Sequence, residues 1–353
     1  MEERKKYESQ YLYMLKCICC YLVICIHFGK SVVGIFYELT RVAVPIFFII
    51  QGRFLALPTS GKTIDECKKR NCKTEKKLVK MTCMVTMVYV VFSYIFFVIC
   101  DGNSVESWLQ MKFAPMEWIR LFIFNTSGII ADTTLFFDHQ WYLYAAIWCV
   151  AIVIVCQKRL NSIFYILAIL PLGLQFIDLY GLHFLGAGIY FGSFYIKRIG
   201  LTRNFLCTGL PFMAIGMLIQ QVAEQPVDGD RIRLRRNILL CGLLCGGILT
   251  YVEYFKSGEQ ELYLGSVMIA ICVVAFGTVY GHPVPRTIVY IGKELSGYIF
   301  FWHPLLAALI SRIVPADMTP LQYAISVGLC STILAIILER TKKLYERKRK
   351  TNN

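Results

Sequence analysis

A lysine and a histidine share one face of the first apolar stretch of the chain. Lys16 and His27 lie within residues 9–28 and are separated by ten residues. In an α-helix this spacing is close to a whole number of turns, so the two side chains lie within about 20° of each other and about 16 Å apart along the axis. An ionisable residue inside an apolar helix is costly and is usually functional. The pair predicts a cation near one face of a membrane and, near the other, an imidazole that could act as a base or a nucleophile.

Further polar residues begin or interrupt later apolar stretches. Arg41 stands at the start of the second stretch, close to where the chain emerges after His27, and could stabilise an oxyanion or hold an anionic acceptor. The other candidates fall at the start of the fourth stretch and inside the ninth: Asp138, His139, Trp141, Tyr142, Ser296, Tyr298 and His303. Structural roles are the alternative for several of them: a lysine that reaches the interface, an aromatic belt, or close helix packing at Gly52.

The composition predicts that these residues are carried by membrane-spanning helices. Of the 353 residues, 57% are hydrophobic and only 17% are charged, whereas a soluble domain carries about 25% charged residues. Apolar runs long enough to cross about 30 Å of hydrocarbon recur along the chain. We predict ten spans, near residues 9–28, 39–57, 78–100, 139–156, 162–180, 205–222, 237–254, 262–281, 295–313 and 321–339. The expected fold is an all-α, polytopic bundle of about ten transmembrane helices.

The distribution of charge predicts the orientation of the bundle. The net charge is +14, and the basic residues concentrate in 53–80, 231–236 and 340–350. With ten spans, all three segments lie on the same side as the N-terminus, so the positive-inside rule predicts that both termini are cytosolic. The charge therefore indicates topology and contact with anionic lipids, and it argues against a nucleic-acid partner.

The sequence also predicts where three connecting regions lie and what role the cysteines have. Residues 58–77 form a polar cytosolic loop, and residues 101–138 form an outer region in which 118–124 is a short helix at the interface. A third region, 181–203, is also outside and contains an apolar segment at 189–195 that could be an eleventh buried piece. Most of the 15 cysteines lie in apolar stretches, and the pair at 67 and 72 has no nearby histidine, so we expect no metal site.

Four motifs in order resemble the acyltransferase-3 membrane family, which includes O-acetyltransferases of bacterial surface polysaccharides. They are Lys16-x10-His27, Arg41-Val-Ala-Val-Pro-Ile-Phe-Phe followed by Gly52, His139-Gln-Trp-Tyr-Leu, and Ser296-Gly-Tyr-Ile-Phe-Phe-Trp-His303. The resemblance implies a ten-span domain at residues 1–340, followed by a basic cytosolic tail at 341–353, in a bacterial inner membrane. It implies transfer of an acyl group, usually acetyl, from cytosolic acetyl-CoA to a hydroxyl or amine of an extracytoplasmic glycan or small molecule.

The resemblance also implies residue roles. His27 is the expected catalytic residue, with Arg41 and Asp138 assisting, and Lys16 is expected to bind acetyl-CoA. The family's cytosolic Arg-x-x-Arg is best matched by Lys77-Leu-Val-Lys80, in which lysine offers phosphate a point charge without the bidentate fork of arginine. The residues expected to bind the acceptor are His139, Trp141, Tyr142, Ser296, Tyr298 and His303.

The second predicted span supports another interpretation of the function. The run from Arg41 to Phe48 also resembles the membrane portions of vancomycin-resistance serine racemases. The alternative function is therefore the membrane domain of a serine or alanine racemase, or a serine transporter, in which Lys16 and His27 would gate or bind substrate. No racemase-like segment or pyridoxal-phosphate lysine motif is present in the sequence.

Overall fold

The computed structural model describes residues 2–28, 33–58, 61–125, 138–177, 180, 190–191, 194–195, 203–225, 228–313 and 318–351. Nearly all regular structure in these residues is helical, and each of the ten predicted stretches falls on a helix or on consecutive helices. Within these residues, five helices are long and apolar enough to cross a membrane: Glu3–His27, Ile64–Cys100, Phe205–Glu224, Gly229–Ser257 and Pro320–Arg349. The chain is thus a helical, multi-pass membrane protein, and the exact number of spans and the side of the termini remain predictions.

The chain forms two compact units, and each is described by itself. The first unit comprises residues 1–47 and 226–353, and the second comprises residues 48–225. The elements of the first unit are α1 (Glu2–Phe28), η1 (Gly34–Phe36), α3 (Tyr37–Thr40), the start of α4 (Ala43–Phe54), α12 (Gly229–Ser257), α13 (Leu264–Phe276), α14 (Arg286–Tyr290), the π-helical turn η10 (Ile291–Leu295), α15 (Ser296–Ile313) and α16 (Pro320–Thr351).

The second unit contains the remaining helices and one small pair of strands. Its elements are the rest of α4, α5 (Ile64–Tyr94), the π-helical η3 (Ile95–Cys100), α6 (Val105–Lys112), α7 (Pro115–Phe124), η4 (Asp138–Gln140), α9 (Trp141–Val155), η5 (Gln157–Arg159), α10 (Ser162–Phe176), β1 (Tyr190–Phe191), β2 (Phe194–Tyr195), the π-helical η9 (Phe205–Gly209) and α11 (Leu210–Glu224).

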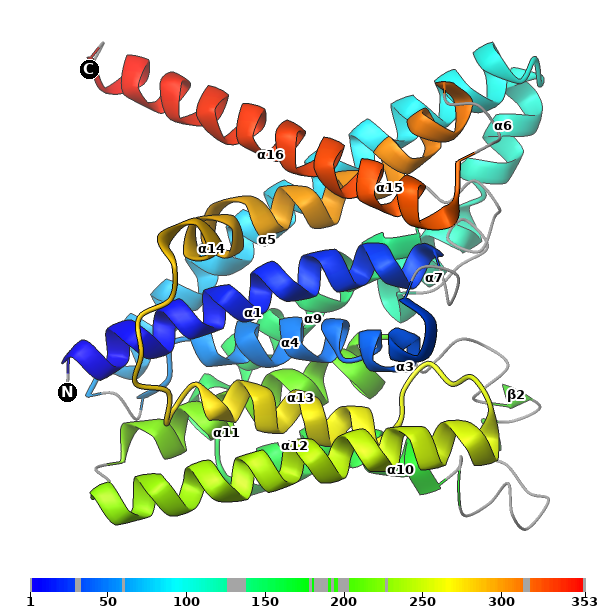
Figure 1. The fold of residues 1–353 in the computed structure, drawn as a ribbon. Helices are drawn as coiled ribbons and strands as arrows, with labels where there is room; N and C mark the ends of the chain where they lie inside the picture. Colours follow the sequence, from blue (N-terminus) through cyan, green and yellow to red (C-terminus); the bar gives the residue numbers. More distant parts are fainter. Residues whose placement is uncertain are drawn as a thin grey trace. The chain divides into compact units, whose positions relative to one another are not determined.

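In the first unit, α1 packs along α15, α16 and η10, while α12 packs along α13 (Figure 1). A glycine permits the closest approach of α1, because a Cβ on Gly292 would collide with the backbone of Tyr13. Another permits the α12–α13 contact, since a Cβ on Gly265 would collide with the backbone of Thr250. Small residues at such crossings let helix backbones approach closely in lipid.

In the second unit, two glycines allow α4 and α11 to cross. A Cβ on Gly52 would overlap the backbone of Met213, and a Cβ on Gly216 would overlap the backbone of Ile49. The alternative interpretation of Gly52 as a close packing contact is therefore confirmed.

Helix α5 begins with a capping box, in which the Thr63 hydroxyl accepts from the Glu66 amide and the Glu66 carboxylate accepts from the Thr63 amide.

Three of the predicted connecting features differ in detail from the structure. Residues 118–124 are helical, as predicted, but they belong to the longer helix α7. The apolar segment at 189–195 is not a helix where it is described, because Tyr190–Phe191 and Phe194–Tyr195 pair as antiparallel strands. Most of the predicted loop at 58–77 is also not a loop, because α5 begins at Ile64.

Candidate active site

The two histidines of the first and ninth predicted spans meet in the first unit. The rings of His27 on α1 and His303 on α15 have centroids 5.1 Å apart, with an interplanar angle of 48°. His27 is half-buried, whereas His303 is only 1% exposed. The sequence predicted both residues as site residues, but it did not predict that they touch.

The surroundings of His303 constrain its ring. Its Nδ1 lies 3.2 Å from the carbonyl oxygen of Ile299, one helical turn earlier. The ring of Phe300 lies 6.2 Å away, measured between centroids, and Pro304 follows inside the helix. Since a carbonyl oxygen can only accept, this geometry places the proton of a neutral His303 on Nδ1 and leaves Nε2 as an acceptor.

Arg41 ends the short helix α3, which packs against α1. Its Nη2 donates to the hydroxyl of Tyr37 at 3.1 Å, and its guanidinium carbon lies 5.1 Å from the centroid of that ring. Among the described residues, the buried Nε of Arg41 has no hydrogen-bond partner. The guanidinium is therefore held at one edge and keeps a donor for an oxyanion or an anionic group.

A buried carboxylate next to this arginine was missed by the sequence analysis. Glu38 is 2% exposed and accepts a hydrogen bond of 2.8 Å from the hydroxyl of Tyr263, which is fully buried at the start of α13. A carboxylate oxygen can only accept, so the Tyr263 phenol keeps its proton and donates it. A signal was available: an acidic residue three positions before Arg41, at the entry to an apolar stretch, is costly unless it is paired.

The neighbouring helix α12 supplies a second carboxylate at this end. Glu253 is 7% exposed, and its two oxygens accept the backbone amides of Leu264 and Gly265 at 3.0 and 2.8 Å. An anion at the first turn of a helix satisfies amides that have no partner in the helix itself. Glu253 therefore fixes the start of α13 and, with it, the position of Tyr263.

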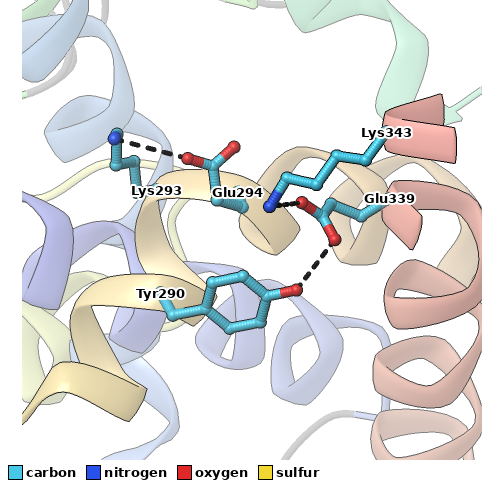
Figure 2. A network of polar contacts seen from close by, with 5 residues as sticks. All are labelled: Tyr290, Lys293, Glu294, Glu339 and Lys343. Carbon is cyan, nitrogen blue, oxygen red and sulfur yellow. Dashed lines mark hydrogen bonds and ion pairs between the residues drawn. The ribbon is translucent and has the colours of Figure 1, made fainter. Parts of the chain in front are cut away.

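Lys16 lies near the middle of α1 and interacts electrostatically with Glu294 of the turn η10. Figure 2 shows the polar residues around this turn: Lys293 pairs with Glu294 at 3.4 Å, and Tyr290 donates to Glu339 at 2.9 Å. Lys343 forms an ion pair with the same Glu339. An anionic ligand at Lys16 would therefore compete with Glu294 for the charge of this lysine.

The two other predicted residues of α15 lie nearer its start. Ser296 is buried, and its hydroxyl donates to the carbonyl of Gly292 at 2.7 Å, as serines often do within helices. Tyr298 is half-buried. Ser296 therefore has a local structural role, and its role in acceptor binding stays a prediction.

The residues predicted at the start of the fourth span form a cluster within the second unit. His139 is 4% exposed, and its ring lies 5.1 Å from that of Tyr89, measured between centroids. Tyr142 donates to Gln51 at 3.2 Å, and Trp141 packs near Phe48. The side chain of Asp138 lies outside the described residues, although its backbone is described.

Gln51 directly precedes Gly52, and its side-chain oxygen accepts the hydrogen bond from Tyr142. The side-chain oxygen of Gln140 accepts a hydrogen bond of 2.9 Å from the hydroxyl of Thr86, and that hydroxyl lies 3.0 Å from the hydroxyl of Tyr144. The aromatic residues at this position therefore serve largely as a buried, hydrogen-bonded core. That arrangement lowers the exposed area they could offer to an acceptor.

Lys77 and Lys80 are exposed on α5. Their ammonium groups can therefore contact a phosphate of a soluble ligand without first breaking a buried ion pair. Among the described residues, no group of three or more His, Cys, Asp or Glu side chains is arranged to hold a metal ion.

A comparison with protein families gives one extended match. The acyltransferase-3 family, described as an acyltransferase domain, matches residues 9–340. An amino-acid racemase of Enterococcus faecalis is 22% identical over 325 residues, which are 88% of this chain and 42% of that protein. The chain therefore spans about two fifths of the length of this curated relative. No solved structure matches the chain.

Proposed function

The chain belongs to the acyltransferase-3 family, and on that premise we propose that it moves an acyl group, acetyl in the first instance, across the plasma membrane of a bacterium. The proposed donor is acyl-CoA at the cytosolic face, and the proposed acceptor is a hydroxyl or amine of an extracytoplasmic glycan or small molecule. The observation that carries the proposal is the contact of His27 with His303, because a supported imidazole in an apolar bundle is suited to proton transfer.

His27 can perform the transfer as a general base. Its neutral imidazole removes the proton of the acceptor hydroxyl while that oxygen attacks the thioester carbonyl. The carbon–sulfur bond then breaks, and His27 returns the proton to the departing thiolate. Arg41, held by Tyr37, has a donor with which to stabilise the negative charge on the carbonyl oxygen. If His27 is instead a nucleophile, it takes the acyl group first and passes it to the acceptor.

The residues proposed for donor binding carry positive charge. Lys77 and Lys80 are exposed and are able to contact the phosphates of the nucleotide, and Lys16 offers a further charge on the helix that carries His27. An acyl-CoA would supply the activated thioester. The expected cost of having lysines instead of arginines is weaker geometric discrimination of the phosphates.

The acceptor is proposed only as a class. His139, Trp141 and Tyr142 were predicted to bind it, and their burial against Tyr89, Phe48 and Gln51 favours an indirect role in shaping the second unit. The racemase or transporter alternative is not favoured, since the racemase name describes a protein of which more than half lies outside the match.

The test is acyl transfer by membranes that contain the overproduced protein. Radiolabelled acetyl-CoA is supplied on the cytosolic side, and label in acid-stable, membrane-associated material is counted for wild type, His27→Ala and the control His282→Asn. We expect transfer by wild type and the control and at least a 10²-fold loss in His27→Ala. Equal label in wild type and in membranes without the protein, for acetyl-CoA and longer acyl-CoAs, would refute the function.

A further inference from the structure

The contact of His303 with His27 assigns His303 a role that the predicted acceptor site did not include. The centroid distance of 5.1 Å sets the two rings in contact without a hydrogen bond between them, and a rotation of the His27 side chain can bring one of its nitrogens within about 3 Å of a nitrogen of His303. Both side chains come from helices of the first unit that pack along one another. The contact is therefore built by two long helices and does not depend on a loop.

The tautomer of His303 follows from its second contact. Nδ1 lies 3.2 Å from the Ile299 carbonyl oxygen, which can only accept, so a neutral ring carries its proton there. Nε2 then presents a lone pair. A ring that is 1% exposed cannot easily exchange this arrangement for hydrogen bonds to water.

We propose that His303 is a positioning residue for His27: in the reacting complex the His27 side chain turns to donate a hydrogen bond to the Nε2 lone pair of His303, and this bond fixes the tautomer and orientation of the His27 ring. The nitrogen of His27 that donates to His303 keeps its proton throughout. The other nitrogen is left unprotonated for the acceptor's proton. This inference rests on the proposed function, because it assigns His303 a part in the same transfer.

His303 neither gains nor loses a proton during the transfer. His27 gains one proton from the acceptor and becomes an imidazolium, while its existing N–H continues to point at His303 Nε2. The neutral His303 disperses part of that charge through the hydrogen bond, as the buried carboxylate does in a serine-protease triad. His27 then gives the gained proton to the thiolate, and both rings return to their starting tautomers.

Two amide variants separate the proposed role from a packing role. In His303→Gln the longer side chain carries an amide oxygen to about the position of Nε2, whereas in His303→Asn the shorter one reaches only the position of Nδ1. We expect His303→Gln to keep kcat within about 10-fold of wild type and His303→Asn to lose about 10²-fold or more. The KM for acetyl-CoA should be unchanged in both.

The same transfer assay decides among the outcomes, with His282→Asn as the matched control on an exposed histidine. Equal kcat in wild type, His303→Gln and His303→Asn would overturn the inference. So would equal losses in the two variants at unchanged KM, because the position of the acceptor atom would then not matter. Transfer that needs His27 but not His303 refutes this inference alone, whereas no transfer by wild type speaks against the proposed function.

A measurement on the wild-type protein covers the case in which the variants fail to fold. The chain has five histidines, so nitrogen-15 NMR of histidine-labelled protein can resolve their tautomers. We expect His303 to carry its proton on Nδ1. A neutral His303 protonated on Nε2 would overturn the inference whatever the variants do.

Discussion

Substituting Gly292 tests whether the approach of α1 to η10 positions the candidate site. A Cβ on Gly292 would lie 2.6 Å from the carbonyl carbon of Tyr13 and 3.2 Å from the amide nitrogen of Cys17, and closer still to the Tyr13 oxygen. Since carbon atoms in contact are about 3.5–4.0 Å apart, the two backbones must separate by about 1 Å. Neither neighbour is a flexible side chain, so the strain cannot be relieved by a rotamer change.

The expected cost of Gly292→Ala combines strain with a functional effect. Overpacking of a close-packed contact costs about 1–3 kcal/mol. The displaced helix α1 also carries Lys16 and His27, and a shift of about 1 Å at a reacting group can cost about 10²-fold in rate. We therefore expect a lower Tm in detergent and a reduced acetyl-transfer rate in Gly292→Ala.

Gly297→Ala is the matched control, since Gly297 lies five residues later in the same helical segment. Its Cβ would meet only the Phe301 ring at 3.6 Å, an ordinary contact, and the position is exposed. Alanine is favoured over glycine in a helix by about 0.5–1 kcal/mol, so this variant should match or exceed the Tm of wild type. If Gly292→Ala is as stable and as active as Gly297→Ala, the close approach does not position the site.

Three further predictions concern groups around the site. Lys16→Ala should raise the KM for acetyl-CoA more than it lowers kcat; an unchanged affinity in a titration would make Lys16 an anchoring residue. Tyr263→Phe should lower the unfolding free energy by about 1–3 kcal/mol, measured by thermal unfolding, because buried Glu38 loses a donor, and an unchanged Tm would contradict this. Burial lowers the pKa of Lys112 to about 8 from its usual 10.5, so the folded protein binds fewer protons between those values and its stability should rise with pH there. Lys112→Met should flatten that rise in Tm, and an identical pH dependence in both proteins would refute the assignment.

The helical elements could be predicted because each apolar stretch is long and continuous. The site could be predicted only in part, since sequence places a residue along one helix but does not say which helix lies beside it. His27 and His303 were both singled out, yet their contact depends on the packing of α1 against α15. Glu38 was missed for the same reason, because the phenol that pairs with it is 225 residues away.

The strand pair and the long last helix show how far amino-acid composition predicts the local backbone structure. Tyr190–Phe191 and Phe194–Tyr195 have an apolar composition that fits a buried helix as well as a strand, and periodicity cannot separate the two over so few residues. The composition changes from apolar to basic near residue 340, and α16 continues through this change because lysine, arginine and glutamate are good helix formers.

The same spacing recurs on the two helices that meet at the candidate site. Lys16 and His27 are eleven positions apart on α1, and Gly292 and His303 are eleven positions apart on the segment formed by η10 and α15. Gly292 meets α1 beside Lys16, at Tyr13 and Cys17, while His303 meets it at His27. Contacts at both ends of an interval of about 16 Å require the helices to run nearly alongside one another, because strongly crossed helices touch at only one point. Lys16 and His27 are thus both carried on the region of α1 that contacts η10 and α15, so a shift of α1 against this segment would move both residues.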